Sequence, residues 1–293
     1  MKNFDYRMPK SLDEVSNILE HSELQPRFLA GGTDLVVAMR NRRLQPDLVI
    51  DTKWVHELNE LSFDDHAMTL GASVTCRELC KDSQVSRFFP ALIDCATLIG
   101  GVQTQSRATL GGNLCNAAPS ADTVPVLIVL STLAKICGPD GCREVPVEQF
   151  CTGPGKTVLG AKDVLVSFRV PLPRDREGAF FLRFIPRNDM DIAVANAAAN
   201  VVVSNNGDEF LEARVAIGAV APTPLHVSDA AQELSGQPVS DAVIAKAAST
   251  AREAARPISD MRGTLDQRKH LTEVLVRRAL NGALKRARGV THE

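Results

Sequence analysis

Two short glycine-containing segments carry the residues whose types and spacing could bind an anion. The first is Ala30-Gly31-Gly32-Thr33-Asp34, and the second is Thr109-Leu110-Gly111-Gly112-Asn113. Glycine lets the backbone adopt positive φ and lets a ligand approach without a Cβ in the way. Successive backbone N–H groups in such a turn can converge on phosphate oxygens. Two such turns would suit a diphosphate, although two ordinary tight turns are favoured when these residues are considered alone.

Polar side chains near the glycine segments could add to the backbone donors. Thr33, Thr109 and Asn113 carry side-chain donors, and Arg107 lies beside the second segment. Asp122 could accept hydrogen bonds from a ribose or a ring N–H, but a helix cap is favoured on sequence alone. Neither the P-loop pattern nor G-x-G-x-x-G occurs, which excludes a P-loop or a Rossmann nucleotide site.

The composition excludes several classes of function. Of the 293 residues, 44% are hydrophobic, 23% are charged and 4% are aromatic, and the formal net charge is −2. A nucleic-acid surface and a charged membrane surface are therefore not expected. No apolar stretch is long enough to cross a bilayer, and the opening residues MKNFDYRMPK lack the apolar region of a secretory signal. We expect a cytoplasmic protein.

The cysteines indicate neither a disulfide framework nor a metal site. Their number is odd and no pair has CxxC spacing, so no zinc or iron–sulfur pattern is present. We expect reduced thiols that are buried or incidental, and no metal in this chain. The seven cysteines are Cys76, Cys80, Cys95, Cys115, Cys137, Cys142 and Cys151.

The hydrophobic pattern and the turn residues predict a mixture of helices and strands. Ser11 and Glu14 have the spacing of a capping box at the start of the first helix. Residues 100–122 read as a long irregular run, and the polar residues 172–178 indicate a domain boundary. The predicted strands are 27–30, 47–51, 68–73, 133–137, 163–171, 195–203 and 211–220, and the later predicted helices are 36–39, 75–80, 90–99, 124–131, 228–235, 240–255 and 266–288.

Several short motifs, taken together, resemble one family. The chain resembles the FAD-binding (medium) subunits of molybdenum hydroxylases, the family of the xanthine dehydrogenase and carbon monoxide dehydrogenase flavoproteins. The motifs occur in the family's order over nearly the whole chain. They therefore favour phosphate binding over ordinary tight turns at the two glycine segments. They are AGGTDL (30–35), RATLGGN (107–113), NAAPSAD (116–122), TGPGKT (152–157), DVLVSFRVP (163–171), PRNDMDIA (186–193) and GAVAPTP (218–224).

The resemblance implies an α+β fold with two domains. Residues 1–175 would form an FAD-binding domain of the p-cresol-methylhydroxylase type, built from α+β subdomains at about 1–55 and 56–175. Residues 176–293 would form an α+β domain of the carbon monoxide dehydrogenase flavoprotein C-terminal type.

The resemblance also implies which residues bind a non-covalent FAD. The first glycine segment would surround the FAD pyrophosphate, where the role of Asp34 stays open, and the second would form another phosphate-side loop. Arg183 stands where relatives often have a lysine beside the flavin, and residues 186–193 would cover the isoalloxazine ring. Asp122 would make a polar contact, Ile99 would pack near the cofactor, and Leu165 would contact it through its backbone. The full set is Phe28, Leu29, Ala30, Gly31, Gly32, Thr33, Asp34, Leu35, Ile99, Thr109, Leu110, Gly111, Gly112, Asn113, Asp122, Leu165 and Arg183.

By the same resemblance, the chain is expected to be one subunit of a xanthine dehydrogenase-like oxidoreductase. Electrons would come from a [2Fe-2S] small subunit and pass through FAD as hydride to NAD+. A large subunit with the molybdenum cofactor would hydroxylate the substrate, a purine, in a dimer of heterotrimers. No catalytic nucleophile or acid is expected in this chain, because the flavin carries the chemistry. The alternatives are a free-standing FAD-dependent reductase or oxidase of the same superfamily and a non-enzymatic nucleotide-binding module.

Overall fold

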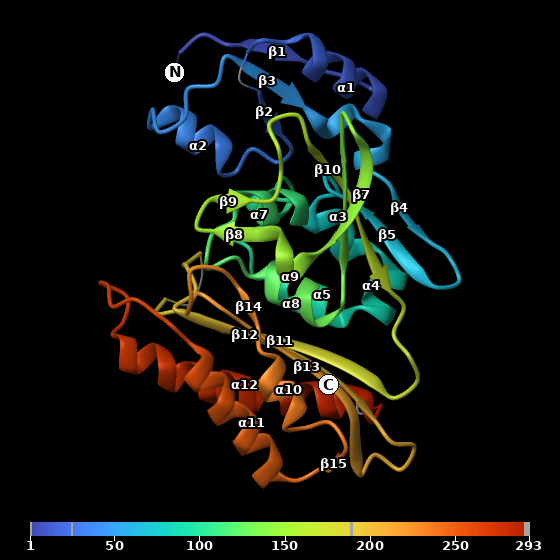
Figure 1. The fold of residues 1–293 in the computed structure, drawn as a ribbon, viewed down its shortest axis with the longest axis vertical. Coiled ribbons are helices and arrows are strands. Elements are labelled where there is room, and N and C mark those ends of the chain that lie inside the picture. Colours follow the sequence, from blue (N-terminus) through green and yellow to red (C-terminus); the bar gives the residue numbers. More distant parts are fainter. Residues whose placement is uncertain (1, 25, 188–189, 290–293) are drawn as a thin grey trace.

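The chain begins with a small parallel sheet that has the strand order β1-β3-β2. The computed structural model describes residues 2–24, 26–187 and 190–289 of the chain. This first sheet and its helices lie at the top of Figure 1. The elements are β1 (Asp5–Arg7), α1 (Leu12–His21), β2 (Pro26–Leu29), α2 (Leu35–Arg40), β3 (Leu48–Asp51), and the short 3-10 helices η1 (Thr52–Trp54) and η2 (His56–Leu58).

A five-stranded antiparallel sheet with the order β4-β5-β10-β6-β7 occupies the middle of the molecule (Figure 1). Seven helices and a small β8–β9 ribbon accompany it. The strands are β4 (Leu61–Phe63), β5 (Ala67–Gly71), β6 (Leu133–Gly138), β7 (Gly141–Pro146), β8 (Cys151–Gly153), β9 (Lys156–Thr157) and β10 (Val164–Pro171). The helices are α3 (Cys76–Lys81), α4 (Ser83–Phe88), α5 (Pro90–Ala96), α6 (Val102–Gln105), α7 (Leu110–Asn116), α8 (Thr123–Val129) and α9 (Val147–Phe150).

A second antiparallel sheet, ordered β11-β12-β13-β14 with β15 beside β13, carries the last helices on one face. These elements form the lower part of Figure 1, coloured from yellow through orange to red. The strands are β11 (Glu177–Phe184), β12 (Ala195–Val203), β13 (Glu209–Gly218), β14 (Leu225–His226) and β15 (Gln237–Pro238), and the helices are α10 (Ser228–Gln232), α11 (Asp241–Ala254) and α12 (Leu265–Ala287). The mixture of helices and sheets confirms the expected α+β class.

Hydroxyl side chains begin several helices as the sequence predicts. Ser240 accepts from the backbone N–H of Val243 at the start of α11. Ser11 accepts from the N–H of Glu14 at the start of α1. The Glu14 carboxylate, however, accepts from the N–H of Lys10 rather than that of Ser11, so only half of the predicted capping box forms.

The central and C-terminal parts are joined through an ion pair between α12 and α5. The Arg286 guanidinium donates to both oxygens of Asp94, over 2.6 and 2.9 Å. It also donates to the Ala179 carbonyl and lies 4.5 Å from the centre of the Phe180 ring. The last long helix is therefore attached both to its own sheet and to a helix of the central part.

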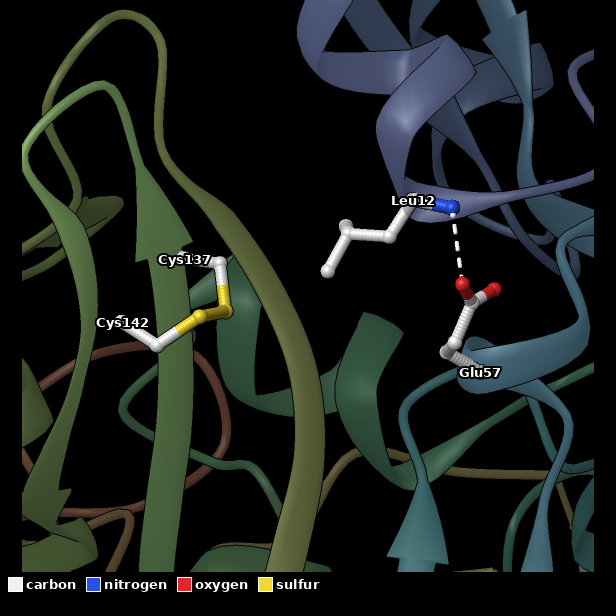
Figure 2. Close-up of a disulfide and its surroundings, with 4 residues drawn as sticks. All are labelled: Leu12, Glu57, Cys137 and Cys142. Atoms are coloured by element: carbon white, nitrogen blue, oxygen red, sulfur yellow. Dashed lines mark hydrogen bonds between the residues drawn. A yellow bond between two sulfur atoms is a disulfide. The ribbon is translucent and has the colours of Figure 1, made fainter.

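The structure corrects the expectation that all cysteines are reduced thiols. Cys137 and Cys142 lie opposite each other on β6 and β7 and form a disulfide (Figure 2). Cys137 is buried in a cluster that packs Val15 of α1 and Ile50 of β3 against β10. The odd total had argued against a framework, but one pair plus five free cysteines also gives an odd number. Figure 2 also shows Glu57, which accepts from the N–H of Leu12 at the start of α1.

No helix within residues 2–24, 26–187 and 190–289 has both the length and the apolar composition needed to cross a membrane.

Candidate functional site

The first glycine segment connects β2 to α2. Gly32 has a φ of +76°, the left-handed conformation that the sequence analysis expected of a glycine here. A Cβ on Gly32 would lie 2.8 Å from Leu29 Cδ1 and 3.2 Å from Val36 Cγ2. Both the backbone conformation and the space around it therefore favour glycine at this position.

Backbone N–H groups of the first segment are available to a ligand. None of the backbone hydrogen bonds found outside the helices and strands of the described residues uses the N–H of Gly31, Gly32 or Thr33. Thr33 is half-buried, and Asp34 is exposed at the start of α2 without capping it. Three neighbouring unpaired donors in a turn are the arrangement that binds phosphate oxygens.

The second glycine segment is helical, which corrects the expectation of a matching turn. Thr109 is the N-cap of α7, and its hydroxyl accepts from the N–H of Gly112 at 2.9 Å. Gly111 and Gly112 lie in the first turn of α7 and have no positive φ. Asn113 Oδ1 accepts from the hydroxyl of Thr123 at 2.7 Å, which leaves its Nδ2 as the side-chain donor.

Close packing explains why Gly31 and Gly111 are glycines. A Cβ on Gly31 would lie 1.9 Å from the carbonyl oxygen of Arg107, just before the second segment. A Cβ on Gly111 would lie 2.3 Å from the carbonyl oxygen of Ala72. The two segments are thus in direct contact, and the open side of Gly31 faces protein rather than a ligand. α2 follows the first segment, and α7 contains the second.

Asp122 belongs to a buried polar cluster and does not cap α8, which corrects the interpretation favoured on sequence alone. It occupies the N-cap position, but its side chain makes no capping bond. Instead its carboxylate accepts from Arg183 at 2.5 Å and from Asn196 Nδ2 at 3.0 Å. Burial raises the pKa of the Asp122 carboxyl, and Arg183 and Asn196 oppose that rise.

The Arg183 guanidinium has a buried donor without a partner among the described residues. The side chain is only 6% exposed, and its Nε has no hydrogen-bond partner among the described residues. An unpaired buried N–H costs free energy unless a ligand or water accepts from it. Arg183 therefore combines a cationic side chain, held in place by Asp122, with a donor that a bound group could use.

The remaining candidate residues contribute packing. Leu110 and Leu165 belong to the central core cluster, and Ile99 packs against it. Leu165 lies on β10 opposite Ile136, beside an irregularity in the strand register. Phe28 packs on the cluster between α1 and β10. Of the predicted covering loop 186–193, residues 188 and 189 lie outside the described residues.

Sequence reasoning missed Asn196, which is fully buried and holds the second oxygen of Asp122. Its only signal was that it is one of two amides, with Asn200, in the otherwise apolar strand residues ANAAANVVV. A buried polar side chain in such a run needs a partner. The partner is 74 residues earlier in the chain, so no local pattern could identify it.

The described residues contain no group of three or more side chains suited to hold a metal ion. Among the thiols, Cys76 and Cys95 are fully buried, and burial raises the pKa of Cys76 to about 12. A thiol with such a pKa stays protonated and is a poor nucleophile. Together, the described site residues offer backbone N–H donors at the first glycine segment and a buried guanidinium held by Asp122.

Comparisons with known proteins match both parts of the chain. Residues 2–173 match a family described as the FAD binding domain in molybdopterin dehydrogenase. Residues 180–283 match the CO dehydrogenase flavoprotein C-terminal domain. The first match covers the parallel sheet and the central sheet, and the second covers most of the C-terminal sheet and its helices.

Similar proteins extend over nearly the full length. A putative xanthine dehydrogenase FAD-binding subunit of Escherichia coli (strain K12) is 30% identical over 286 residues, 97% of each chain. The carbon monoxide dehydrogenase medium chain of Hydrogenophaga pseudoflava is also 30% identical, over 97% of this chain and 98% of its own. The solved structure of carbon monoxide dehydrogenase from the same organism superimposes with a TM-score of 0.93 at 29% identity, over 97% of this chain and 98% of the other.

Proposed function

This chain belongs to the family of FAD-binding subunits of molybdenum-containing hydroxylases, and from that premise we propose that it serves a xanthine dehydrogenase-like enzyme as its FAD subunit. Its relatives are subunits of oxidoreductases. The proposal is that it binds FAD non-covalently, accepts electrons from a [2Fe-2S] partner and reduces NAD+. The observation that carries it is the row of N–H groups at Gly31, Gly32 and Thr33, which have no partner in the described part of the chain and lie within the matched FAD-binding domain.

We assign the pyrophosphate of FAD to the first glycine segment. Its N–H groups can donate to phosphate oxygens, and the positive φ of Gly32 turns the backbone toward them. Thr109 and Asn113 of α7 would supply additional polar contacts. The assignment needs no basic side chain in the turn, because backbone dipoles can hold a phosphate by themselves.

We assign the Asp122–Arg183 pair to the flavin end. The buried Arg183 Nε is a donor with no partner among the described residues, so an acceptor on the cofactor would satisfy it. Asp122 would keep the guanidinium in place and balance its charge. Ile99 and Leu165 would provide apolar contacts beside it. Bound FAD supplies the conversion between one-electron and two-electron transfer, and the protein supplies binding and orientation.

The proposed partners are a large subunit with the molybdenum cofactor and a small [2Fe-2S] subunit, in a dimer of heterotrimers. The similarity over nearly the full length of two dehydrogenase subunits supports the presence of partner subunits, while the dimer of heterotrimers is a proposal. The choice of a purine substrate rests on the TGPGKT and PRNDMDIA motifs, and the choice of NAD+ rests on the resemblance to the family. We also propose a domain division at 175/176, supported by the interval between the end of β10 at Pro171 and the start of β11 at Glu177.

The test is to express the chain alone and with its two proposed partners. The isolated chain should take up FAD and show the visible absorbance of a bound flavin, released on denaturation without a covalent adduct. The native complex should contain molybdenum and iron in the partner chains and reduce NAD+ with xanthine. A colourless chain that cannot take up FAD would contradict the proposal. A solitary, catalytically complete monomer would support a free-standing flavoenzyme instead.

A further inference from the structure

Two buried hydroxyl groups meet between the first sheet and the central sheet. Thr52 Oγ1 lies 2.7 Å from Ser73 Oγ and 3.3 Å from the carbonyl oxygen of Leu29, to which it donates. Thr52 has a single hydroxyl proton, so when it donates that proton to Leu29, the Ser73 hydroxyl donates to Thr52. Thr52 and Ser73 are 2% and 4% exposed, so water does not compete for these bonds. The result is a series of hydrogen bonds that runs from Ser73 through Thr52 to Leu29.

The two ends of this series lie next to the two glycine segments. Leu29 is the last residue of β2 and immediately precedes Ala30 and Gly31. Ser73 follows Ala72, whose carbonyl oxygen is the atom that a Cβ on Gly111 would meet. The series of hydrogen bonds therefore links the start of the first segment to the residues on which α7 packs.

Both hydroxyl residues are themselves held by other bonds. The N–H of Ser73 donates to the Leu58 carbonyl at 2.8 Å. The carbonyl oxygen of Thr52 accepts from Asn59 Nδ2 at 3.1 Å. Neither residue can shift without breaking these bonds. Through Thr52, the central part of the molecule therefore holds Leu29 in place.

The direct contact between the segments does not by itself set their relative position. Gly31 touches the Arg107 backbone by close packing, which limits approach but not sliding. A hydrogen-bonded link at Leu29 supplies the directional restraint that packing lacks. Two segments that bind one diphosphate need such a restraint, because each must meet its own phosphate oxygens at hydrogen-bond distance.

We propose that Thr52 and Ser73 are positioning residues that hold the first glycine segment in place relative to α7 for FAD binding. This inference rests on the proposed function, and it adds two residues that do not touch the cofactor. The link is present before FAD binds. It therefore lowers the conformational entropy that the first glycine segment would otherwise lose on binding FAD. The loss of the link should therefore weaken FAD binding more than it weakens the fold.

The variants are chosen to separate positioning from general stability. Thr52→Val removes the hydroxyl at nearly constant volume, and Thr52→Ser keeps the hydroxyl. Ser73→Ala removes the other member, and the double variant tests whether the two act through one bond. Thr272→Val is the matched control, because Thr272 is also fully buried and donates to a carbonyl, that of Arg268 in α12.

The measurement is FAD affinity of the full-length apoprotein by flavin fluorescence, together with urea unfolding of the same samples. We expect Thr52→Val to raise the Kd for FAD about tenfold, which corresponds to about 1.4 kcal/mol. Thr52→Ser should restore binding to within about threefold of wild type, or about 0.7 kcal/mol. The double variant should bind no more weakly than Thr52→Val, and Thr272→Val should lower stability while leaving the Kd unchanged.

Several outcomes would overturn the inference. One is wild-type affinity in both Thr52→Val and Ser73→Ala, and another is an equal loss of affinity in Thr272→Val. If Thr52→Val does not fold, the FAD affinity of Ser73→Ala, which removes a hydroxyl without adding a methyl group, decides the question. A wild-type chain that binds no FAD would instead contradict the proposed function, so the two failures are distinguishable.

Discussion

The carbonyl oxygen of Arg107 lies 1.9 Å from the position that a Cβ on Gly31 would occupy. No side chain can be placed at residue 31 unless the two backbones separate. The first glycine segment is therefore required by its protein neighbour as well as by any ligand. This contact brings together parts of the chain that the sequence had linked only by their similar composition.

Gly31→Ala should weaken both folding and FAD binding. Overfilling a closely packed contact typically costs about 1–3 kcal/mol, and here the displaced group is backbone rather than a flexible side chain. Urea unfolding and an FAD titration would measure the two effects. Gly153→Ala is the control, because a Cβ there would come no closer than 3.8 Å to its neighbours. Equal affinities for FAD in the two variants would contradict the assignment of the first segment.

Asp122→Asn should be strongly destabilising. The change leaves the Arg183 charge buried without its counter-ion, which typically costs about 3–5 kcal/mol. The double variant Asp122→Leu/Arg183→Met removes both charges and should be less destabilised than Asp122→Asn, as urea unfolding would show. Lys246→Met is the control, because it breaks the exposed pair with Glu233 and should cost at most about 1 kcal/mol. If the losses of stability from the separate Asp122 and Arg183 substitutions add up to that of the double variant, the two side chains do not stabilise each other.

Tyr6 should ionise at unusually high pH. Its phenol donates to the Asp51 carboxylate, and this bond together with burial raises the pKa of Tyr6 to about 12. Tyr6 is the only tyrosine in the sequence, so the ultraviolet absorbance of tyrosinate reports on it alone.

The raised pKa of Tyr6 makes the folding stability depend on pH. The pKa of Tyr6 is higher in the folded state than in the unfolded state, where it is about 10. The Tyr6–Asp51 bond therefore contributes fully to folding stability below about pH 10. Its contribution is lost as the pH rises toward 12. Asp51→Asn should return the titration midpoint toward that of a free tyrosine, whereas Asp47→Asn, which alters the exposed partner of Lys2, should not. An unshifted midpoint in the wild type would disprove the Tyr6–Asp51 bond.

The Cys137–Cys142 disulfide should be detectable by counting thiols. Denatured, unreduced protein should react at five cysteines, and all seven should react after reduction. Because the bridge closes a short loop, it should contribute about 2 kcal/mol to stability. Dithiothreitol should therefore lower the urea midpoint of the wild type but not that of Cys137→Ala/Cys142→Ala. Seven reactive thiols before reduction would show that the bridge is not formed.

Much of the secondary structure could be predicted from local patterns. The alternation in residues 163–171 predicted β10 (Val164–Pro171), and Ser240 with its following apolar spacing predicted α11. These signals are local because they depend on side-chain periodicity and capping within a few residues. The strands β1, β4, β7 and β11 were not predicted. The first two have three residues each, and β7 is largely exposed, so apolar alternation is weak or absent there.

The site was predicted less completely because its geometry depends on contacts that are distant in sequence. Gly111 and Gly112 suggested a turn, since glycine disfavours helices. Thr109 nevertheless starts a helix there, and the packing of Gly111 on Ala72 explains its glycine. Asp122 looked like a cap because its partner Arg183 is 61 residues later. The hydroxyls of Thr52 and Ser73 carried no sequence signal of their own.

The link between Arg286 and Asp94 has a consequence for the order in which the molecule can be completed during synthesis. Arg286 follows Asp94 by 192 residues. At ribosomal rates of about 5–20 residues per second, it is made roughly 10 to 40 s later. Throughout that interval the Asp94 carboxylate of α5 lacks its partner, and β11, which lies beside α5, lacks the covering helix α12. Nascent chains that have finished the glycine segments therefore remain structurally incomplete until Arg286 has been made and can pair with Asp94.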